Sequence, residues 1–183
     1  MEKGININMV INGCLKGHPA SQKKLFEYHY SYVKSICLRY GGSYHEAEEM
    51  LNDTFYKVFR YLDRYDQKRV FLPWLSKVCV NACLEYNRKY LKMIKLEEHL
   101  DNIQVKWEEE LDSTIDIPTV LRSLSPAYRT IFNLYVIEEY KHQEIAEMLG
   151  ISVNTSKSNL SRAKEKLRKQ LSDFRTSSKL KFL

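Results

Sequence analysis

Apolar side chains recur at intervals of three and four residues through most of this 183-residue chain, and hardly any stretch alternates apolar with polar residues. The first spacing places apolar side chains on one face of an α-helix, whereas alternation would indicate a β-strand. The chain contains only six Gly and four Pro, so few positions interrupt the helical patterns. The sequence therefore predicts an all-α fold.

Charge divides the chain into three parts. Residues 1–96 hold 16 Lys and Arg against 9 acids (net +7), residues 97–116 hold one Lys against eight acids (net −7), and residues 117–183 hold 12 cations against six acids (net +6). The acidic strip has weak periodicity and is followed by Pro118, which disfavours a helix at the preceding residue. We expect two small helical domains at residues 1–92 and 119–171, an acidic linker at residues 93–118 and a flexible tail at residues 172–183.

Composition sets further limits. Hydrophobic residues make up 44% of the chain, which is enough for packed cores. No apolar run approaches the roughly 20 residues that span a bilayer, and the N-terminal segment lacks the order of a secretory signal. We therefore expect a cytoplasmic protein without disulfides, whose four Cys fill cores. The net charge of +6 is a mild indication of a polyanionic partner.

Residues 43–62 form a clear helical pattern, after an amphipathic helix that is expected to end near Gly41 and Gly42. Its core stripe is expected at three- and four-residue spacing: Ala47, Leu51, Thr54, Val58 and Leu62. Another face then carries Glu48, Asn52, Phe55 and Phe59. Two interpretations stay open: the helix is buried on two sides, or this aromatic and polar face docks on a partner.

A third helix is expected to begin at Pro73, because the first helical position needs no backbone N–H. Its core stripe would consist of Leu75, Val78, Cys79, Ala82 and Tyr86, and its other face of Trp74, Lys77, Asn81, Arg88 and Lys89. Cations for phosphates, a ring for stacking and an amide for base edges suit a nucleic-acid strand. The alternative is a half-buried Trp beside a solvated basic edge. The loop YDQKRVFL before this helix is interpreted as lying outside the core.

Residues 142–171 have the layout of a helix-turn-helix, preceded by a helix capped at Ser125. A short helix stops at Gly150, and Ser152 can cap a longer helix from Val153 to about Leu171. The longer helix is expected to bury Leu160, Ala163 and Leu167 and to expose Asn154, Thr155, Lys157, Ser158, Ser161, Arg162, Lys164 and Lys166. Hydroxyls, amides and cations on one face suit a recognition helix in a major groove. A plain amphipathic helical hairpin is the alternative.

Two long motifs resemble one known family. AEEMLNDTFYKVFRYLDRYD followed by FLPWLSKVCVNACLEYNRK resembles the N-terminal domain of bacterial RNA polymerase sigma factors of the extracytoplasmic-function (ECF) class. LSPAYRTIFNLYVIEEYKHQEIAEMLGISVNTSKSNLSRAKEKLRK resembles their C-terminal promoter-binding domain. Both occur in the family's order, over most of residues 20–171. The resemblance implies a non-enzymatic initiation factor that binds core polymerase, reads the −10 and −35 promoter elements and helps to melt the first.

The resemblance also implies roles for single residues. Polymerase binding would fall to Glu48, Asn52, Asp53 and Phe55; −10 recognition and melting to Lys68, Arg69, Phe71, Trp74, Asn81, Arg88 and Lys89; and −35 recognition to Asn154, Thr155, Lys157, Ser158, Ser161 and Arg162. Asn52 stands where the family more often has Gln. Ser156 stands where an apolar residue is usual, so it is expected to pack less well or to bond back to a carbonyl.

The partners implied by the resemblance are core RNA polymerase, through the clamp and flap of its large subunits, promoter DNA and an anti-sigma factor. It implies no cofactor, metal or small-molecule substrate, and association with the nucleoid when the holoenzyme forms. Two other functions stay open. One is a polymerase-independent helix-turn-helix regulator. The other is an enzyme with a metal site built from Cys79, Cys83 and a His, because the two Cys lie four apart on one helix face.

Overall fold

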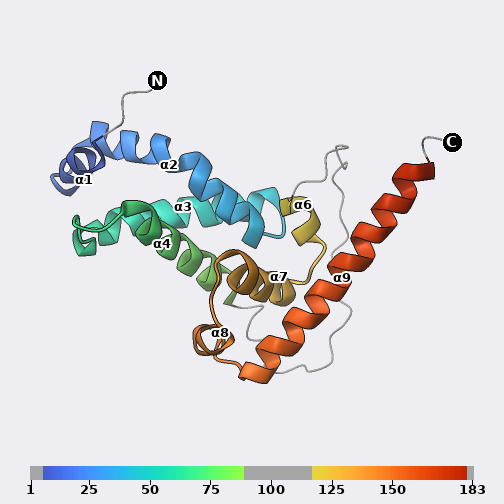
Figure 1. Cartoon of the computed structure of the whole chain (residues 1–183). Helices are drawn as coiled ribbons and strands as arrows, with labels where there is room; N and C mark the ends of the chain where they lie inside the picture. The colour runs from blue at the N-terminus through green and yellow to red at the C-terminus, as the bar shows by residue number, and fades with distance from the viewer. Residues whose placement is uncertain (1–5, 89–116, 181–183) are drawn as a thin grey trace. The chain divides into compact units, whose positions relative to one another are not determined.

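The computed structural model describes residues 6–88 and 117–180, with side chains as far as residue 172. The chain divides into two compact units, Met1–Tyr86 and Asn87–Leu183. Every element of the described residues is helical, which confirms the all-α fold (Figure 1). Most of the expected acidic linker lies outside the described residues. No described helix is both long enough and apolar enough to cross a membrane.

The N-terminal unit consists of α1 (Ile7–Leu15), α2 (Pro19–Tyr40), α3 (Tyr44–Tyr61), the 3-10 turn η1 (Leu62–Arg64) and α4 (Phe71–Tyr86). The helix α2 packs against α1, α3 and α4, and α3 packs against α4 (Figure 1). The core stripe expected on α3 is confirmed, since all five of its residues are buried. This unit therefore has one core, enclosed by α2, α3 and α4.

The start of α3 shows how the sequence sets a helix boundary. The Ser43 hydroxyl accepts a hydrogen bond from the Glu46 N–H at 3.1 Å, and the Glu46 carboxylate accepts one from the Gly42 N–H at 2.7 Å. These two bonds satisfy backbone donors that the helix itself leaves without partners. The polar residues before the apolar stripe thereby fix where α3 begins.

Two features of this unit differ from the sequence-based expectation. The helix α1 was not expected, and it buries Val10, Ile11 and Cys14. It approaches α2 so closely that a Cβ at Gly13 would lie 2.1 Å from the Ser21 hydroxyl oxygen. The helix α4 begins at Phe71, before Pro73, because a first turn tolerates Pro at any position that needs no N–H.

The C-terminal unit consists of α6 (Ile117–Arg122), α7 (Pro126–Phe132), the π-helical turn η2 (Asn133–Ile137), α8 (His142–Leu149) and α9 (Val153–Leu180). The prediction of a linker up to Pro118 is wrong at its end, because Ile117 and Pro118 form the first turn of α6. Part of the predicted tail from residue 172 is helical, because α9 continues to Leu180.

The core of the C-terminal unit joins its first helices to α9. Leu121, Leu124 and Tyr128 pack with Ala163 and Leu167. Leu160 is buried as well, so the expected inner face of the long helix is confirmed. The opposite face of α9 is thereby held outward at a fixed orientation within this unit.

Candidate functional site

The turn between α8 and α9 has the geometry of a helix-turn-helix. Gly150 adopts the left-handed conformation, with φ 62° and ψ 40°, a region that costs residues with a Cβ about 1–2 kcal/mol. The Ile151 N–H donates to the Ala146 carbonyl at 3.0 Å, closing the end of α8. The Ser152 hydroxyl then accepts from the Thr155 N–H at 2.9 Å and caps α9. The predicted turn and cap are both confirmed.

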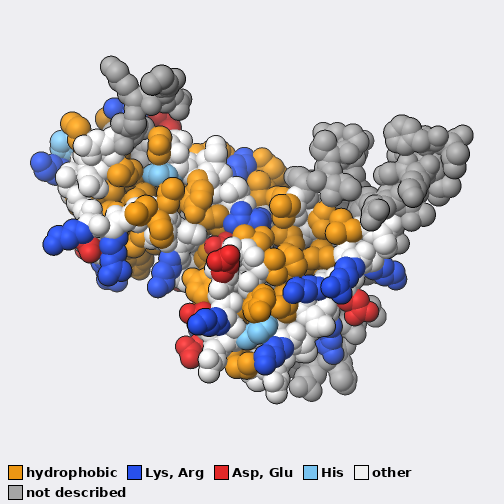
Figure 2. Space-filling view, viewed as in Figure 1, with side chains coloured by type: hydrophobic (Ala, Val, Ile, Leu, Met, Phe, Trp, Pro, Cys, Tyr) orange, Lys and Arg blue, Asp and Glu red, His pale blue; other side chains and the backbone are white. Residues whose placement is uncertain are grey.

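The outer face of α9 carries the residues predicted to contact the −35 element. Thr155 is half-buried, and the other five are exposed: Asn154, Lys157, Ser158, Ser161 and Arg162. Lys and Arg side chains gather along α9 (Figure 2). One helix face therefore presents donors and acceptors for base edges together with cations for phosphates.

Ser156 is completely buried, and its packing differs from both expectations. Its hydroxyl lies 2.9 Å from Nδ1 of His142, at the start of α8. The His142 ring stacks on Tyr135 at 4.3 Å between centroids, and the Lys164 ammonium lies 5.8 Å from the Tyr135 ring centre. Burial, together with Lys157 and Lys164, lowers the pKa of His142. A polar bridge thus joins α8 and α9.

The residues predicted to contact the −10 element fall into two groups in the N-terminal unit. The first surrounds the turn before α4, where the Asp66 carboxylate accepts from the Lys68 N–H at 3.0 Å and lies 3.6 Å from the Arg69 guanidinium. Both cations are exposed. The Tyr65 hydroxyl donates to the Arg69 carbonyl and anchors the turn from within. The loop is therefore a defined turn with a cationic outer surface.

Phe71 and Tyr65 correct the prediction that this loop lies outside the core. Phe71 is 4% exposed and Tyr65 is 7% exposed. The Phe71 ring lies 5.2 Å from Tyr65, 5.5 Å from Trp74 and 5.1 Å from His29. Phe71 therefore supports the half-buried Trp74 ring from inside and offers no exposed surface to a nucleic acid.

The second group follows α4. Trp74 and Asn81 are seven residues apart, which places them two turns apart along one face. Asn81 and Lys77 are exposed, as is Arg88 just after the helix, and Lys89 lies outside the described residues. The predicted core residues Leu75, Cys79 and Ala82 are buried, whereas Val78 and Tyr86 are only half-buried. An amide, an aromatic ring and cations thus share the outer side of α4.

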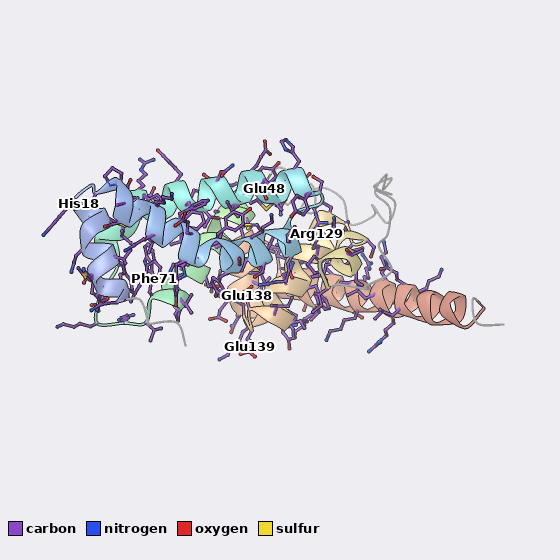
Figure 3. The ribbon with its side chains drawn as sticks, turned by 90° about the horizontal axis from the view of Figure 1, so that it is seen from above. His18, Glu48, Phe71, Arg129, Glu138 and Glu139 are labelled. Carbon is purple, nitrogen blue, oxygen red and sulfur yellow. The ribbon has the colours of Figure 1, made fainter. Side chains whose placement is uncertain are left out.

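The residues predicted to bind polymerase lie on α3, but they do not form one surface. Glu48 (Figure 3) is half-buried and Asn52 is exposed. Phe55 is 4% exposed and lies between Phe26, at 4.5 Å, and Phe59, at 6.3 Å. Of the two interpretations of this stripe, burial on a second side holds for Phe55.

The exposed line on α3 instead continues through Tyr56, which the sequence analysis did not select. Glu48, Asn52 and Tyr56 are spaced four apart, so they follow one another along the helix. Tyr56 is 60% exposed. Its spacing from Asn52 was the signal that could have identified it.

Two lysines fix the acidic side chains of this surface. The Lys34 ammonium lies 3.0 Å from the Glu48 carboxylate and 4.6 Å from the Tyr44 ring centre. The Lys57 ammonium lies 2.6 Å from Asp53 and 2.8 Å from Glu85 on α4. Although burial opposes it, hydrogen bonds to Asp53 and Glu85 raise the pKa of Lys57. Asp53 is therefore held by its pairing with Lys57.

These surfaces define a class of protein: an all-α DNA-binding protein with a helix-turn-helix in one unit and a second polar, aromatic and cationic helix face in the other. Family models agree on both units. Sigma-70 region 2 matches residues 25–92, and Sigma-70 region 4 matches residues 115–167. Both units are thus recognised as parts of one type of initiation factor.

Individual relatives narrow the class. The ECF RNA polymerase sigma factor SigW of Bacillus subtilis is 30% identical over 158 residues, covering 77% of this chain and 83% of SigW. SigE of Mycolicibacterium smegmatis is 29% identical over 161 residues, covering 82% of this chain but only 62% of SigE. The chain belongs to the ECF class of bacterial RNA polymerase sigma factors.

A solved structure supports the fold. The sigma factor RpoE, in complex with the anti-sigma factor NepR from Bartonella quintana, matches with a TM-score of 0.50 at 19% identity, over 82% of this chain and 96% of that chain. At this identity the likeness concerns the arrangement of helices alone.

Proposed function

We propose that this sigma factor binds core RNA polymerase through α3, reads a −10 element through α4 and its preceding turn, and reads a −35 element through α9. The observation that carries the proposal is the pairing of regions 2 and 4 in one chain, with a polar and cationic outer face on the region 4 recognition helix. The factor acts in the cytoplasm, and at the nucleoid when it is part of the holoenzyme. It performs no catalysis of its own.

The polymerase-binding surface consists of Glu48, Asn52, Asp53 and Tyr56. Three of them follow one line of α3, and the ion pairs with Lys34 and Lys57 hold the acids in place. Phe55 acts from beneath, because its packing against Phe26 fixes the orientation of α3. An ordered surface that combines exposed polar side chains with an exposed aromatic ring is suited to docking on a protein such as the polymerase clamp.

The polymerase-binding surface is tested by retention of core polymerase on the immobilised full chain. Asn52→Ala combined with Tyr56→Ala should weaken binding at least tenfold, because both side chains project from the surface without supporting the core. Glu27→Gln on α2, an exposed acid whose carboxylate lies 3.7 Å from the Lys23 ammonium, is the matched control and should bind normally. If the double variant retains core polymerase as well as the parent chain, the polymerase-binding surface must lie elsewhere.

The −10 surface consists of Lys68, Arg69, Trp74, Asn81, Arg88 and Lys89. The exposed Asn81 amide can hydrogen-bond an extruded base, while Trp74 offers a stacking face that Phe71 backs. The cations hold the phosphate backbone. Asn81→Ala should slow promoter opening while leaving polymerase binding intact, as measured by permanganate reactivity of the melted strand; equal opening by both proteins would contradict this role.

The −35 surface consists of Asn154, Thr155, Lys157, Ser158, Ser161 and Arg162. Losing one base contact from such a helix costs about 1–3 kcal/mol, or roughly 5- to 150-fold in affinity. Arg162→Ala should lower holoenzyme affinity for promoter fragments in that range. Arg168→Ala, also an exposed cation of α9, is the matched control and should have a much smaller effect. If the two variants lose the same promoter affinity, Arg162 contributes only its positive charge and no specific base contact.

Transcription with purified components tests the function as a whole. Core polymerase supplied with this chain should produce transcripts that start at discrete sites of genomic fragments, and no such transcripts should appear without it. If polymerase is not retained and the chain alone binds duplex DNA tightly, the polymerase-independent regulator replaces this proposal. We also propose that an anti-sigma factor controls the chain, by analogy with the complex of RpoE with NepR.

A further inference from the structure

Three cysteine thiols meet inside the N-terminal unit. Cys37 lies on α2, and Cys79 and Cys83 lie one turn apart on α4. Their sulfur atoms all lie within 4.8 Å of one another, and the Cys37 and Cys79 sulfurs are 3.7 Å apart. The side chains are completely buried. The sequence placed only Cys79 and Cys83 on one face; the packing of α2 on α4 brings in Cys37.

The spacing of these sulfurs fits one metal ion at their centre. A zinc–sulfur bond is about 2.3 Å long, so three sulfurs arranged evenly around such an ion would lie roughly 4 Å from one another. The distance of 3.7 Å and the limit of 4.8 Å lie on either side of that value. The three side chains would therefore need only small adjustments to share one ion.

The donor set selects the kind of ion. Thiol and thiolate sulfur prefers soft cations such as monovalent copper, whereas carboxylate and carbonyl oxygen suits magnesium and calcium. Among the described residues the group contains no His or acidic side chain to act as a fourth ligand. Structural zinc sites almost always have four protein ligands. The set therefore fits a soft ion that accepts three sulfur ligands better than it fits zinc.

We propose that Cys37, Cys79 and Cys83 form a binding site for one soft, thiophilic metal cation. Each thiol that binds as a thiolate releases its proton to water, and no electron is transferred. Two thiolates and one neutral thiol balance a divalent ion, and one thiolate with two thiols balances a monovalent ion. Either combination leaves the core without the net charge that would be costly to bury.

Occupancy would connect two parts of the fold that the sigma factor uses. The ion ties α2 to α4, the helix that carries Trp74 and Asn81, and the Thr54 hydroxyl of α3 lies 3.6 Å from the Cys79 sulfur. A ligand that binds the folded chain alone stabilises it by mass action. The site thus lends metal-dependent stability to the domain that carries the −10 surface, and this inference does not depend on the roles proposed for single promoter-contacting residues.

The test uses Cd²⁺ as the probe, with the reduced full chain under anaerobic conditions. Because the thiols are buried, Cd²⁺ is added both to the folded protein and during refolding from urea. We expect one Cd²⁺ per chain, an ultraviolet band from thiolate-to-metal charge transfer, and a higher thermal midpoint. If Cd²⁺ is retained neither after addition to the folded protein nor after refolding, the proposal is overturned.

Variants separate this site from general thiol binding. Cys37→Ser and Cys83→Ser should each weaken Cd²⁺ binding at least tenfold, with Cys37→Ala as a second substitution if the serine disturbs folding. Cys14→Ser is the matched control: Cys14 is also buried, but it lies on α1 outside the three-thiol group, so its variant should bind like the parent chain. Circular dichroism without metal checks that each variant is folded. An unchanged band in Cys37→Ser, or loss of the band in Cys14→Ser, would contradict the site.

Discussion

His29 shows how one buried side chain makes folding sensitive to pH. It is 4% exposed, it contacts the Phe71 ring, and its Nε2 makes no hydrogen bond within the described part of the chain. Burial lowers the pKa of His29 below its usual 6.5. Above that pH the imidazole is neutral in both states. As pH falls below 6.5, the unfolded chain takes up a proton that the folded chain resists, so the free energy of unfolding decreases.

We expect the free energy of unfolding to be lower at pH 5.5 than at pH 7.5. This difference should be smaller in His29→Leu than in the parent chain. Urea unfolding followed by circular dichroism at both pH values measures this difference. His142, whose pKa is also lowered, should account for part of the dependence that remains. The control is His45→Gln, because His45 is 85% exposed on its side chain. The same pH dependence in His29→Leu and the parent chain would refute the prediction.

Ser156 and His142 give a second prediction at single residues. Ser156→Ala removes the hydroxyl that lies 2.9 Å from Nδ1 of the half-buried His142 ring, so it should destabilise the C-terminal unit by about 1–3 kcal/mol. Replacing both residues, as in His142→Leu with Ser156→Val, removes the polar groups together and should recover most of this loss. Thermal unfolding of the full chain measures both. Ser161→Ala, at an exposed position of α9, should change stability by less than about 0.5 kcal/mol. A double variant no more stable than Ser156→Ala would show that the bridge is not the cause.

The turn before α9 decides how the recognition helix is presented. Gly150→Ala places a Cβ in the left-handed region and should cost about 1–2 kcal/mol of stability. Gly17 makes a matched control, because it also has a positive φ, of 74°, and a Cβ there would meet nothing within 4 Å. Both variants should lose similar stability, but only Gly150→Ala should weaken promoter binding. If the two variants bind promoter DNA equally well, the conformation of the Gly150 turn does not affect DNA recognition.

Elements whose apolar stripes are regular were predictable, and those stabilised by distant partners were not. The five predicted core residues of α3 and η1 follow from spacing alone, whereas the buried Met50 and Phe55 of α3 do not belong to that stripe. The helix α1 contains two Asn and one Gly in nine residues, which are poor helix formers, and its burial against α2 overrides them. The position of Phe71 likewise depends on His29 and Tyr65, which no local pattern links to it. The local sequence pattern thus predicted the position of α9, but it wrongly placed the aromatic residues Tyr65 and Phe71 of the loop before α4 outside the core.

At the scale of the molecule, the two surfaces proposed to contact promoter DNA lie in different compact units. Region 2 matches residues 25–92 and region 4 matches residues 115–167, so the surfaces proposed to contact the −10 and −35 elements belong to separate cores. The resemblance to sigma factors could be identified from the sequence because it rests on two motifs in order. Cys37 could not be assigned to a site in the same way, because its partners lie more than 40 positions along the chain.

Separate cores lead to a prediction about energies. Substitutions at independent sites usually change free energies additively, within about 0.3–0.5 kcal/mol. Asn81→Ala in the first unit and Arg162→Ala in the second should therefore act additively on the free energy of open-complex formation, measured with holoenzyme on a promoter that has both elements. The same pair on a promoter whose −35 element is scrambled should show only the Asn81→Ala effect, because Arg162 then has no base to read. On the intact promoter, the double variant could instead lose no more free energy of open-complex formation than the more impaired single variant. That result would mean that the two surfaces act as one unit, and it would contradict the assignment of separate promoter elements to α4 and α9.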